Sequence, residues 1–311
     1  MIQALRLPLR ARRPPDRFRA VTMAVSCIGP LVLIAVVVVL YRVAQPAVAH
    51  YGPGFLFARS WNPVSLDFGA WPFIYGTLAT SAIALALALP VGLAVAIVLA
   101  QPGAQRVRAT IGTGVELLAA IPSVVYGIWA LYVMAPFLFT RVEVPVSQRL
   151  GFVALLSGPP RQTSLFTAAV VLAVMILPTL SAVSRDVLRA VPSGLRESAF
   201  ALGATWWETT WKVTLPAARA GIFGAAVLAL GRALGETIAV TMVIGNRPDV
   251  PASIFYPAYT LASVIANEFT EATGDLYPAA LAELGLVLIL VTLAVNLLAQ
   301  VLVRSTSRAT R

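Results

Sequence analysis

The chain has 311 residues, of which 59% are hydrophobic and only 12% are charged, and its formal net charge is +10. Soluble domains carry about 25% charged residues, and the apolar residues here fall in runs of roughly 20 or more, the length that crosses a bilayer. These features exclude a soluble globular enzyme, a disordered chain and a fibrous repeat. We therefore expect an integral membrane protein.

Six segments are long and apolar enough to span a membrane. In chain order they are residues 20–41, 72–100, 114–139, 163–184, 220–245 and 279–303. An unpaired backbone group in lipid costs several kcal/mol, and the segments are too long for barrel strands, so each is expected to be a helix. The predicted fold class is all-α, a polytopic membrane bundle of six transmembrane helices.

The distribution of charge predicts the orientation of the chain. The side that carries both termini holds sixteen basic and four acidic residues, whereas the opposite side holds six of each, Glu143 included. Because cytoplasmic loops carry an excess of Lys and Arg, both termini are expected in the cytoplasm. The basic residues lie beside spans, so we expect them to meet anionic lipid headgroups and expect no nucleic-acid binding. The first span is longer than a signal peptide's apolar region of about 7 to 15 residues, which favours an uncleaved anchor helix.

Three residue types are too scarce for several kinds of site. The chain has one cysteine, Cys27, and one histidine, His50, which cannot build a structural zinc site, a haem attachment site or a disulfide framework. We expect no metal and no cofactor. The one lysine, Lys212, is not preceded by the glycine loop that cradles phosphates in nucleotide-hydrolysing proteins. The chain is therefore not expected to hydrolyse ATP by itself.

The loop between the fourth and fifth spans is far more polar than its flanks and carries helix signals. Ser193 is placed to cap one short helix, and Gly203 is a natural stop for it. Thr205 followed by Glu208 three residues later forms a capping box that opens a second helix, which should end before Pro216. The sequence predicts a helix, a glycine turn and another helix on the cytoplasmic face.

Two interpretations of this hairpin are open. The tryptophans Trp206, Trp207 and Trp211 suit a surface hairpin lying among lipid headgroups. A docking element for a soluble partner is favoured by a spaced pattern of residues. The pattern comprises Glu197-Ser198-Ala199, Gly203 after three more residues, and Val213-Thr214-Leu215-Pro216 after nine more. It resembles the EAA loop of ATP-binding-cassette (ABC) importer permeases, with Ser198 in place of the usual second alanine and Val213 in place of isoleucine.

The EAA resemblance implies a mechanical role for the loop. In that family it forms a coupling helix that sits in a cleft of a separate ATPase, and closure of the ATPase dimer turns the permease from inward-facing to outward-facing. The residues carried over to ATPase coupling are Glu197, Ser198, Ala199, Gly203, Leu215 and Pro216.

The fifth span contains two charges. Arg232 lies about 20 Å beyond Arg219 at about 1.5 Å per residue, well inside the hydrocarbon. A lone charge there costs at least about 2.5 to 3.5 kcal/mol. Glu236 follows at i+4, so we expect the two side chains to pair on one helix face, with Gly231 and Gly235 letting another helix approach closely.

This expected pair has two interpretations. It is either an ion pair that staples helices together or an arginine whose forked donors meet a tetrahedral oxyanion while the glutamate holds or moderates it. Glu116 and Glu283 are weaker candidates because each lies nearer the end of a span.

Three further segments resemble the phosphate-specific permeases of the PstC type. They are Gly231–Thr237 with its continuation to Asn246, Ile121–Gly127, and Tyr259–Phe269. The resemblance covers roughly residues 20–303 and implies a type I ABC importer permease fold in a bacterial inner membrane. It also implies that Arg232 and Glu236 act in moving phosphate. The implied partners are a sister permease in a heterodimer, an ATP-binding-cassette ATPase dimer and an extracytoplasmic phosphate-binding protein.

With this resemblance the chain divides into four parts. Residues 1–19 form a basic cytoplasmic tail, 20–71 the anchor helix and an extracytoplasmic loop, 72–303 the permease core with its coupling loop at 185–219, and 304–311 a second cytoplasmic tail.

Competing functions remain to be separated. The same machine could carry another oxyanion, such as molybdate or sulfate. A proton-coupled secondary transporter would use Glu116, Glu236 and Glu283 as a relay. A membrane-embedded enzyme is disfavoured, because the one histidine lies outside the spans and no aspartate lies within them.

Overall fold

The computed structural model describes residues 16–100 and 105–308. Six helical segments in this part of the chain are long and apolar enough to cross a membrane. They are Phe18–Leu56, Trp71–Ala100, Ser123–Leu150, Leu165–Ala190, Trp206–Leu234 and Leu276–Val301. The predicted all-α bundle with six spans is confirmed. The arginines that the prediction places in residues 1–15 lie outside the described residues.

The α-helices follow one another in this order: α1 (Asp16–Tyr51), α2 (Trp71–Ala100), α3 (Gln105–Ala120), α4 (Ser123–Trp129), α5 (Ala135–Leu138), α6 (Val144–Leu150), α7 (Leu165–Ala190), α8 (Ser193–Ala201), α9 (Trp206–Thr209), α10 (Leu215–Leu234), α11 (Ile238–Val243), α12 (Leu261–Glu268) and α13 (Leu276–Arg308). Short 3₁₀ turns cover Gly52–Leu56 and Ala154–Leu156, and π-helical turns cover Ala130–Met134, Phe139–Glu143 and Thr210–Thr214. One small antiparallel pair joins β1 (Trp61–Asn62) to β2 (Asp67–Phe68).

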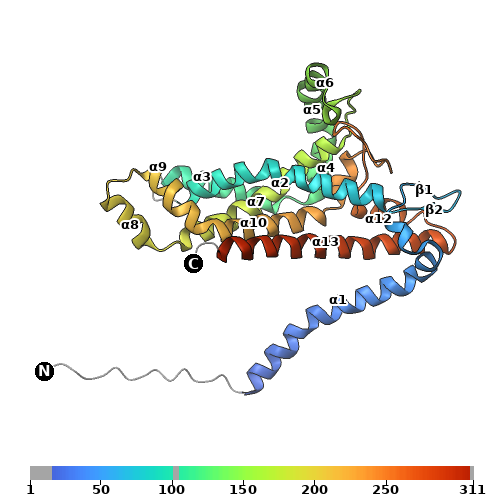
Figure 1. Ribbon diagram of the computed structural model, residues 1–311, viewed down its shortest axis with the longest axis horizontal. Coiled ribbons are helices and arrows are strands. Elements are labelled where there is room, and N and C mark those ends of the chain that lie inside the picture. The colour runs from blue at the N-terminus through green and yellow to red at the C-terminus, as the bar shows by residue number, and fades with distance from the viewer. Residues whose placement is uncertain (1–15, 101–104, 309–311) are drawn as a thin grey trace.

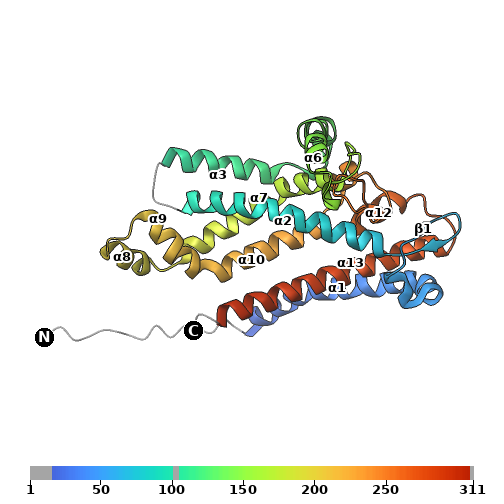
Figure 2. The same cartoon turned by 45° about the horizontal axis from the view of Figure 1, so that its top comes forward.

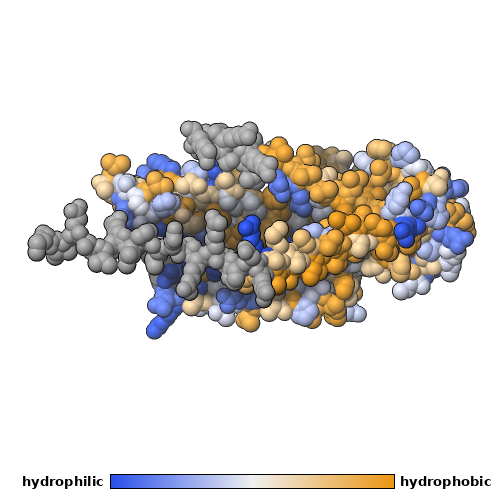
Figure 3. Space-filling view, turned by 90° about the horizontal axis from the view of Figure 1, so that it is seen from below, coloured by the Kyte–Doolittle hydropathy of each residue, from blue (hydrophilic) through white to orange (hydrophobic). Residues whose placement is uncertain are grey.

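Helices α2, α7, α10 and α13 run side by side along the molecule, and α1 follows part of α13 (Figures 1 and 2). Small residues allow α2 and α7 to approach closely: a Cβ at Gly92 would lie 2.9 Å from the Leu180 side chain. On the face where α1 lies, apolar residues predominate over the middle of the molecule and hydrophilic residues gather at its ends (Figure 3). This is the surface pattern expected of a membrane-spanning bundle.

The second, fourth and sixth spans lie close to their predicted positions, with differences at their ends. The second begins at Trp71, the fourth is shifted to Leu165–Ala190, and the helix of the sixth extends over Leu276–Arg308. The first span belongs to a helix that continues to Tyr51, beyond the predicted end at residue 41.

The third span begins later than predicted. Residues 105–120 form the separate helix α3, and the spanning segment starts at Ser123 after an extended Pro122. The predicted span at 114–139 is therefore wrong at its start, because the residue before a proline disfavours helical backbone and the chain breaks at Ile121. Glu116 consequently lies exposed on α3, outside the span. α4 packs against α11, and the helical arm formed by α5 and α6 then projects away from the bundle (Figure 1).

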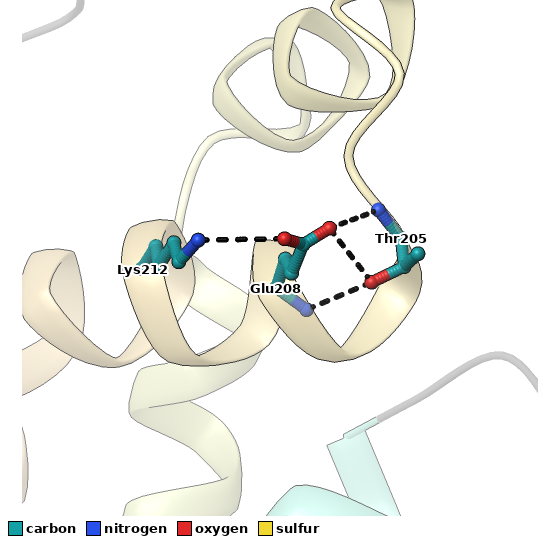
Figure 4. A network of polar contacts seen from close by, with 3 residues as sticks. All are labelled: Thr205, Glu208 and Lys212. Carbon is teal, nitrogen blue, oxygen red and sulfur yellow. Dashed lines mark hydrogen bonds and ion pairs between the residues drawn. The ribbon is translucent and has the colours of Figure 1, made fainter.

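The hairpin forms much as predicted. α8 starts at Ser193, although the capping position belongs to Pro192 and the Ser193 side chain makes no cap. Gly203 adopts a φ of +84°, the left-handed backbone that favours glycine. The capping box is confirmed: the Glu208 amide donates to Thr205 Oγ1 at 3.3 Å, and the Thr205 amide donates to Glu208 Oε2 at 3.0 Å (Figure 4).

The second helix of the hairpin does not end before Pro216, and that prediction is wrong. It passes through the π-helical turn at Thr210–Thr214 directly into α10, so that Trp206–Leu234 is one helical segment. Pro216 falls in the first turn of α10, where its missing N–H is tolerated.

The C-terminal part of the fifth span also differs from the prediction. α10 ends at Leu234, Gly235 caps it, and the six-residue helix α11 starts at Ile238. The predicted continuous span at 220–245 is therefore broken at residues 235–237.

The end of the molecule opposite the hairpin is held together by an aromatic cluster around Glu268. Trp61 Nε1 donates to Glu268 Oε2 at 2.8 Å and the Tyr277 hydroxyl donates to the same oxygen at 2.7 Å. Asn267 Nδ2 donates to the Tyr259 hydroxyl at 3.0 Å, and burial raises the pKa of Tyr259 above its ordinary value. These contacts tie α12 and α13 to the loop that precedes α2.

Candidate functional site

Arg232 lies in the last turn of α10, beside a groove of about 860 Å³ between α7, α10 and α13. Arg232 Nη1 donates to Thr179 Oγ1 of α7 at 3.3 Å, and its side chain is otherwise exposed in the single chain. A cation suits this position because the carbonyl end of a helix carries partial negative charge. The other polar groups that line the groove come from α13, namely Thr292, Asn296 and Gln300.

The structure does not form the expected pair between Arg232 and Glu236. Within the described residues, the side-chain ion pairs are Arg185 with Asp186 and Lys212 with Glu208. The prediction is wrong because it assumes a continuous helix, whereas α10 ends at Leu234 and Glu236 lies beyond the break. The Arg232 guanidinium consequently has no carboxylate at ion-pair distance among these residues and keeps most of its five donors available.

The two glycines beside Arg232 differ in what they face. A Cβ at Gly231 would lie 3.8 Å from Asn296 Oδ1, so this glycine marks the approach of α13. A Cβ at Gly235 would meet nothing nearer than the backbone oxygens of its own chain at 3.9 Å. Both distances are ordinary van der Waals contacts, so neither glycine is required for the packing of another helix.

Glu143 is a buried acid that the sequence places in an external loop. It is 0% exposed at the end of the π-helical turn before α6. Its Oε1 accepts hydrogen bonds from Ser164 Oγ at 2.8 Å and from Thr167 Oγ1 at 2.9 Å, while Oε2 is buried without a hydrogen-bond partner. Both hydroxyls belong to the first turn of α7, where the helix dipole favours a negative charge. The local signal in the sequence is the Ser-x-x-Thr spacing at the start of a span.

The other acids do not form a chain with Glu236. Glu116 is exposed on α3, and Glu283 is 8% exposed on α13, with an unpartnered Oε2. These three carboxylates lie on separate elements of the fold, and no contact within the described residues joins them.

The hairpin presents most of the EAA-like residues on one exposed unit. Glu197 and Ser198 are exposed on α8 and Ala199 is half-buried, while a Cβ at Gly203 would meet open space. Large apolar side chains share this surface: Leu195 is 48%, Phe200 46% and Leu202 90% exposed. Exposed apolar groups on a polar loop indicate a contact surface.

Leu215 and Pro216 lie apart from this exposed unit. They occupy the first turn of α10, and Leu215 packs on the cluster formed by Leu188, Val191 and Ala218. Leu215 therefore joins the hairpin to the ends of α7 and α10. A cavity of about 440 Å³ separates the hairpin from the spans. Its basic lining residues are Arg108, Arg189 and Arg196.

The fold and the site together define the membrane subunit of a transporter. The described part of the chain has six candidate spans, a polar helical hairpin before the fifth, and an arginine that faces a groove between α7, α10 and α13. Residues 88–310 match the family described as the binding-protein-dependent transport system inner membrane component, and the chain belongs to that family. It is therefore a multi-pass inner-membrane permease subunit and not an enzyme.

Named relatives agree with this membership. The chain is 46% identical to the phosphate transport system permease protein PstC of Mesorhizobium japonicum, covering 91% of this chain and 88% of the relative. It is 43% identical to the protein of the same name from Pasteurella multocida, covering 92% and 90%.

Among solved structures, a bacterial alginate ABC transporter in complex with alginate pentasaccharide-bound periplasmic protein is similar in fold. It has a TM-score of 0.57 at 19% identity, covering 91% of this chain and 94% of that one. This likeness supports the type I importer fold.

Proposed function

We propose that this permease moves phosphate through the membrane in an ATP-driven importer and that Arg232 is the group that meets the anion. The observation that carries the proposal is a guanidinium within a candidate membrane span, open to a groove of about 860 Å³ and paired with a single hydroxyl. The relatives, which are named as phosphate transport permeases, supply the substrate.

The chemistry of the two groups is complementary. A guanidinium presents planar, forked donors that match the oxygens of a tetrahedral oxyanion, and hydrogen bonds between two charged groups are the stronger ones. Burying an unpaired arginine costs at least about 2.5 to 3.5 kcal/mol on insertion scales, and an arriving anion would offset part of that cost.

Glu236 would act on Arg232 only if the helix break between them closed. It lies four residues after Arg232, across the helix break at 235–237. Closing the break would return the two side chains to one face of a helix, where the carboxylate would compete with the anion for the guanidinium. Such competition would help to release phosphate.

The assembly that we propose contains three kinds of partner. A sister permease would close the open side of the groove, an ATPase dimer would receive the hairpin, and an extracytoplasmic phosphate-binding protein would deliver the ligand. The exposed apolar residues of α8 support the second. The periplasmic protein named with the alginate transporter supports the third. Both termini would lie in the cytoplasm of a bacterial cell, with the hairpin on the same side.

Uptake of radiolabelled phosphate into vesicles containing the purified complex tests the role of Arg232. Arg232→Ala should lower ATP-driven uptake roughly 10- to 100-fold, the range for losing a hydrogen bond to a charged group. Arg19→Ala, which removes an exposed arginine from α1, is the matched control and should leave uptake unchanged. Copurification of the partners shows that the variant complex is assembled.

Three outcomes would contradict the proposal. Normal uptake by the assembled Arg232→Ala complex would refute the assigned role. Uptake of radiolabelled sulfate or molybdate, without uptake of radiolabelled phosphate, would assign the machine to another oxyanion. Uptake driven by a proton gradient without any ATPase would favour a secondary transporter.

A second experiment tests coupling through the hairpin, for which we propose Glu197, Ser198, Ala199, Gly203, Leu215 and Pro216. Gly203→Val forces a β-branched residue into left-handed backbone, which should distort the turn and uncouple ATP hydrolysis from uptake. Gly194→Val is the control, because Gly194 has open space and lies within α8. Fully ligand-stimulated ATPase activity with normal uptake in Gly203→Val would show that the hairpin does not transmit the force.

A further inference from the structure

A row of polar side chains runs along the second half of α13. Between residues 284 and 303 the helix is apolar except for Thr292, Asn296 and Gln300. Steps of four residues place all three on one face of a helix. At about 1.5 Å per residue, the row extends for about 12 Å.

The same face of α13 lines the Arg232 groove. Thr292, Asn296 and Gln300 border it together with Thr179 and Arg232. The volume of about 860 Å³ far exceeds the roughly 30 Å³ that one water molecule occupies in the liquid. A Cβ at Gly231 of α10 would lie 3.8 Å from Asn296 Oδ1, so α10 and α13 are in contact at this level.

The order of the groups along the groove follows from the directions of the helices. α10 runs away from the hairpin and ends just after Arg232, whereas α13 returns toward the hairpin end (Figures 1 and 2). Asn296 lies opposite Gly231, beside Arg232, so Thr292 lies about one turn farther from the hairpin and Gln300 about one turn nearer to it.

The chemistry of the row differs from that of the arginine. Amide and hydroxyl groups in lipid are unfavourable unless they meet water or polar partners, so a row of them on one face indicates a wet or polar surface. Neutral groups form weaker hydrogen bonds with an anion than a guanidinium does. A path needs sites that bind well enough to admit an ion and weakly enough to release it.

We propose that Thr292, Asn296 and Gln300 line the translocation path as a ladder of neutral hydrogen-bonding groups, which receives phosphate at the level of Arg232 and passes it to Gln300, the member nearest the cytoplasmic end. The ladder rests on the proposed function and extends it to the residues that release the anion.

Cysteine labelling tests whether the ladder faces water. Cys27 is the one native cysteine, so Cys27→Ser gives a background for Asn296→Cys and Gln300→Cys. The full complex in inside-out vesicles is treated with an anionic, membrane-impermeant methanethiosulfonate. Both cysteines should react at least about tenfold faster than Leu298→Cys, because the reagent is charged and the reactive thiolate forms in water, which the proposed groove supplies at positions 296 and 300. Leu298 is the matched control because it lies two residues from Asn296 and is 66% exposed away from the groove. Inorganic phosphate should slow the reaction at both ladder positions.

A functional variant adds an independent measurement. Asn296→Leu should lower phosphate uptake about fivefold, and Asn296→Ser should restore part of it, because a hydroxyl replaces one hydrogen-bonding group of the amide. Leu298→Ala should leave uptake unchanged.

Several results would overturn the ladder, and they are distinguishable from failure of the proposed function. If Arg232→Ala abolishes uptake while positions 296 and 300 label no faster than 298, the ladder is wrong and the role of Arg232 stands. If Asn296→Leu impairs only copurification of the sister permease, the row is an interface between helices. Protection of the two cysteines by sulfate and not by phosphate would overturn both the ladder as a phosphate path and the substrate.

Discussion

Two ionisable side chains inside the candidate spans, Glu143 and Arg232, have opposite surroundings. Glu143 is 0% exposed and accepts hydrogen bonds from two hydroxyls at 2.8 and 2.9 Å. Arg232 lies open to a groove and donates to one hydroxyl at 3.3 Å. The hydrogen-bond partners of both side chains belong to α7 or its N-cap: Ser164 and Thr167 for Glu143, and Thr179 for Arg232. The buried, hydrogen-bonded Glu143 side chain holds the start of α7 in position. Among the described residues, the Arg232 guanidinium has free donors and can bind an anion reversibly.

This comparison predicts that changes at Glu143 act mainly on stability. Glu143→Ala removes two hydrogen bonds and the packing of a fully buried side chain, and it leaves the Ser164 and Thr167 hydroxyls with only their contact to each other at 3.2 Å, which should lower the free energy of unfolding by about 3 kcal/mol. Thermal unfolding of the detergent-solubilised complex measures the loss. Glu143→Gln should lose less, because an amide oxygen still accepts from both hydroxyls. The comparison breaks down if Glu143→Ala leaves the melting temperature unchanged and abolishes uptake in the assembled complex.

Changes at Arg232 should act mainly on transport. Arg232→Lys keeps the charge and removes the planar fork, so we expect uptake to fall about tenfold while the melting temperature stays the same. Uptake per assembled complex, measured beside a melting curve, separates the two effects. Full uptake in this variant would mean that the anion needs only a positive charge and not the forked donors.

The smallest effects are expected from a matched pair of threonines on α7. Thr179→Val removes the hydroxyl beside Arg232 and should change uptake roughly two- to tenfold, the equivalent of about 0.5 to 1.5 kcal/mol. Thr167→Val removes a hydroxyl beside Glu143 and should lower stability by about 1 kcal/mol with uptake preserved. If both variants changed the same quantity, either uptake or stability, the distinction between Arg232 and Glu143 would be wrong.

Most of the fold could be predicted from the sequence, because hydrophobic length alone determines where spans can form. The Thr205–Glu208 capping box and the turn at Gly203 were also predictable, since each depends on a few adjacent residues. Errors occur where two local signals compete. The proline at 122 breaks an apolar run, whereas Pro216 falls at a point where a helix tolerates it.

The candidate site was only partly predictable. Arg232 stands out as a charge within a span, but its neighbours depend on where α10 ends and on which face of α13 meets it. Thr179 is 53 residues away from Arg232 in the sequence, and Glu143 is 21 residues away from Ser164. No local spacing encodes such contacts. The polar row on α13 was visible in the sequence as a period of four, yet its link to Arg232 required the packed structure.

The unbroken helical segment from Trp206 to Leu234 has 29 residues, or about 43 Å at about 1.5 Å per residue. One end belongs to the hairpin and the other carries Arg232 in its final turn. If the hairpin receives force from an ATPase, as we propose, the same helix carries that movement to Arg232 without a relay of side chains. The break at residues 235–237 separates this helix from α11, so α10 can move without displacing the residues beyond the break.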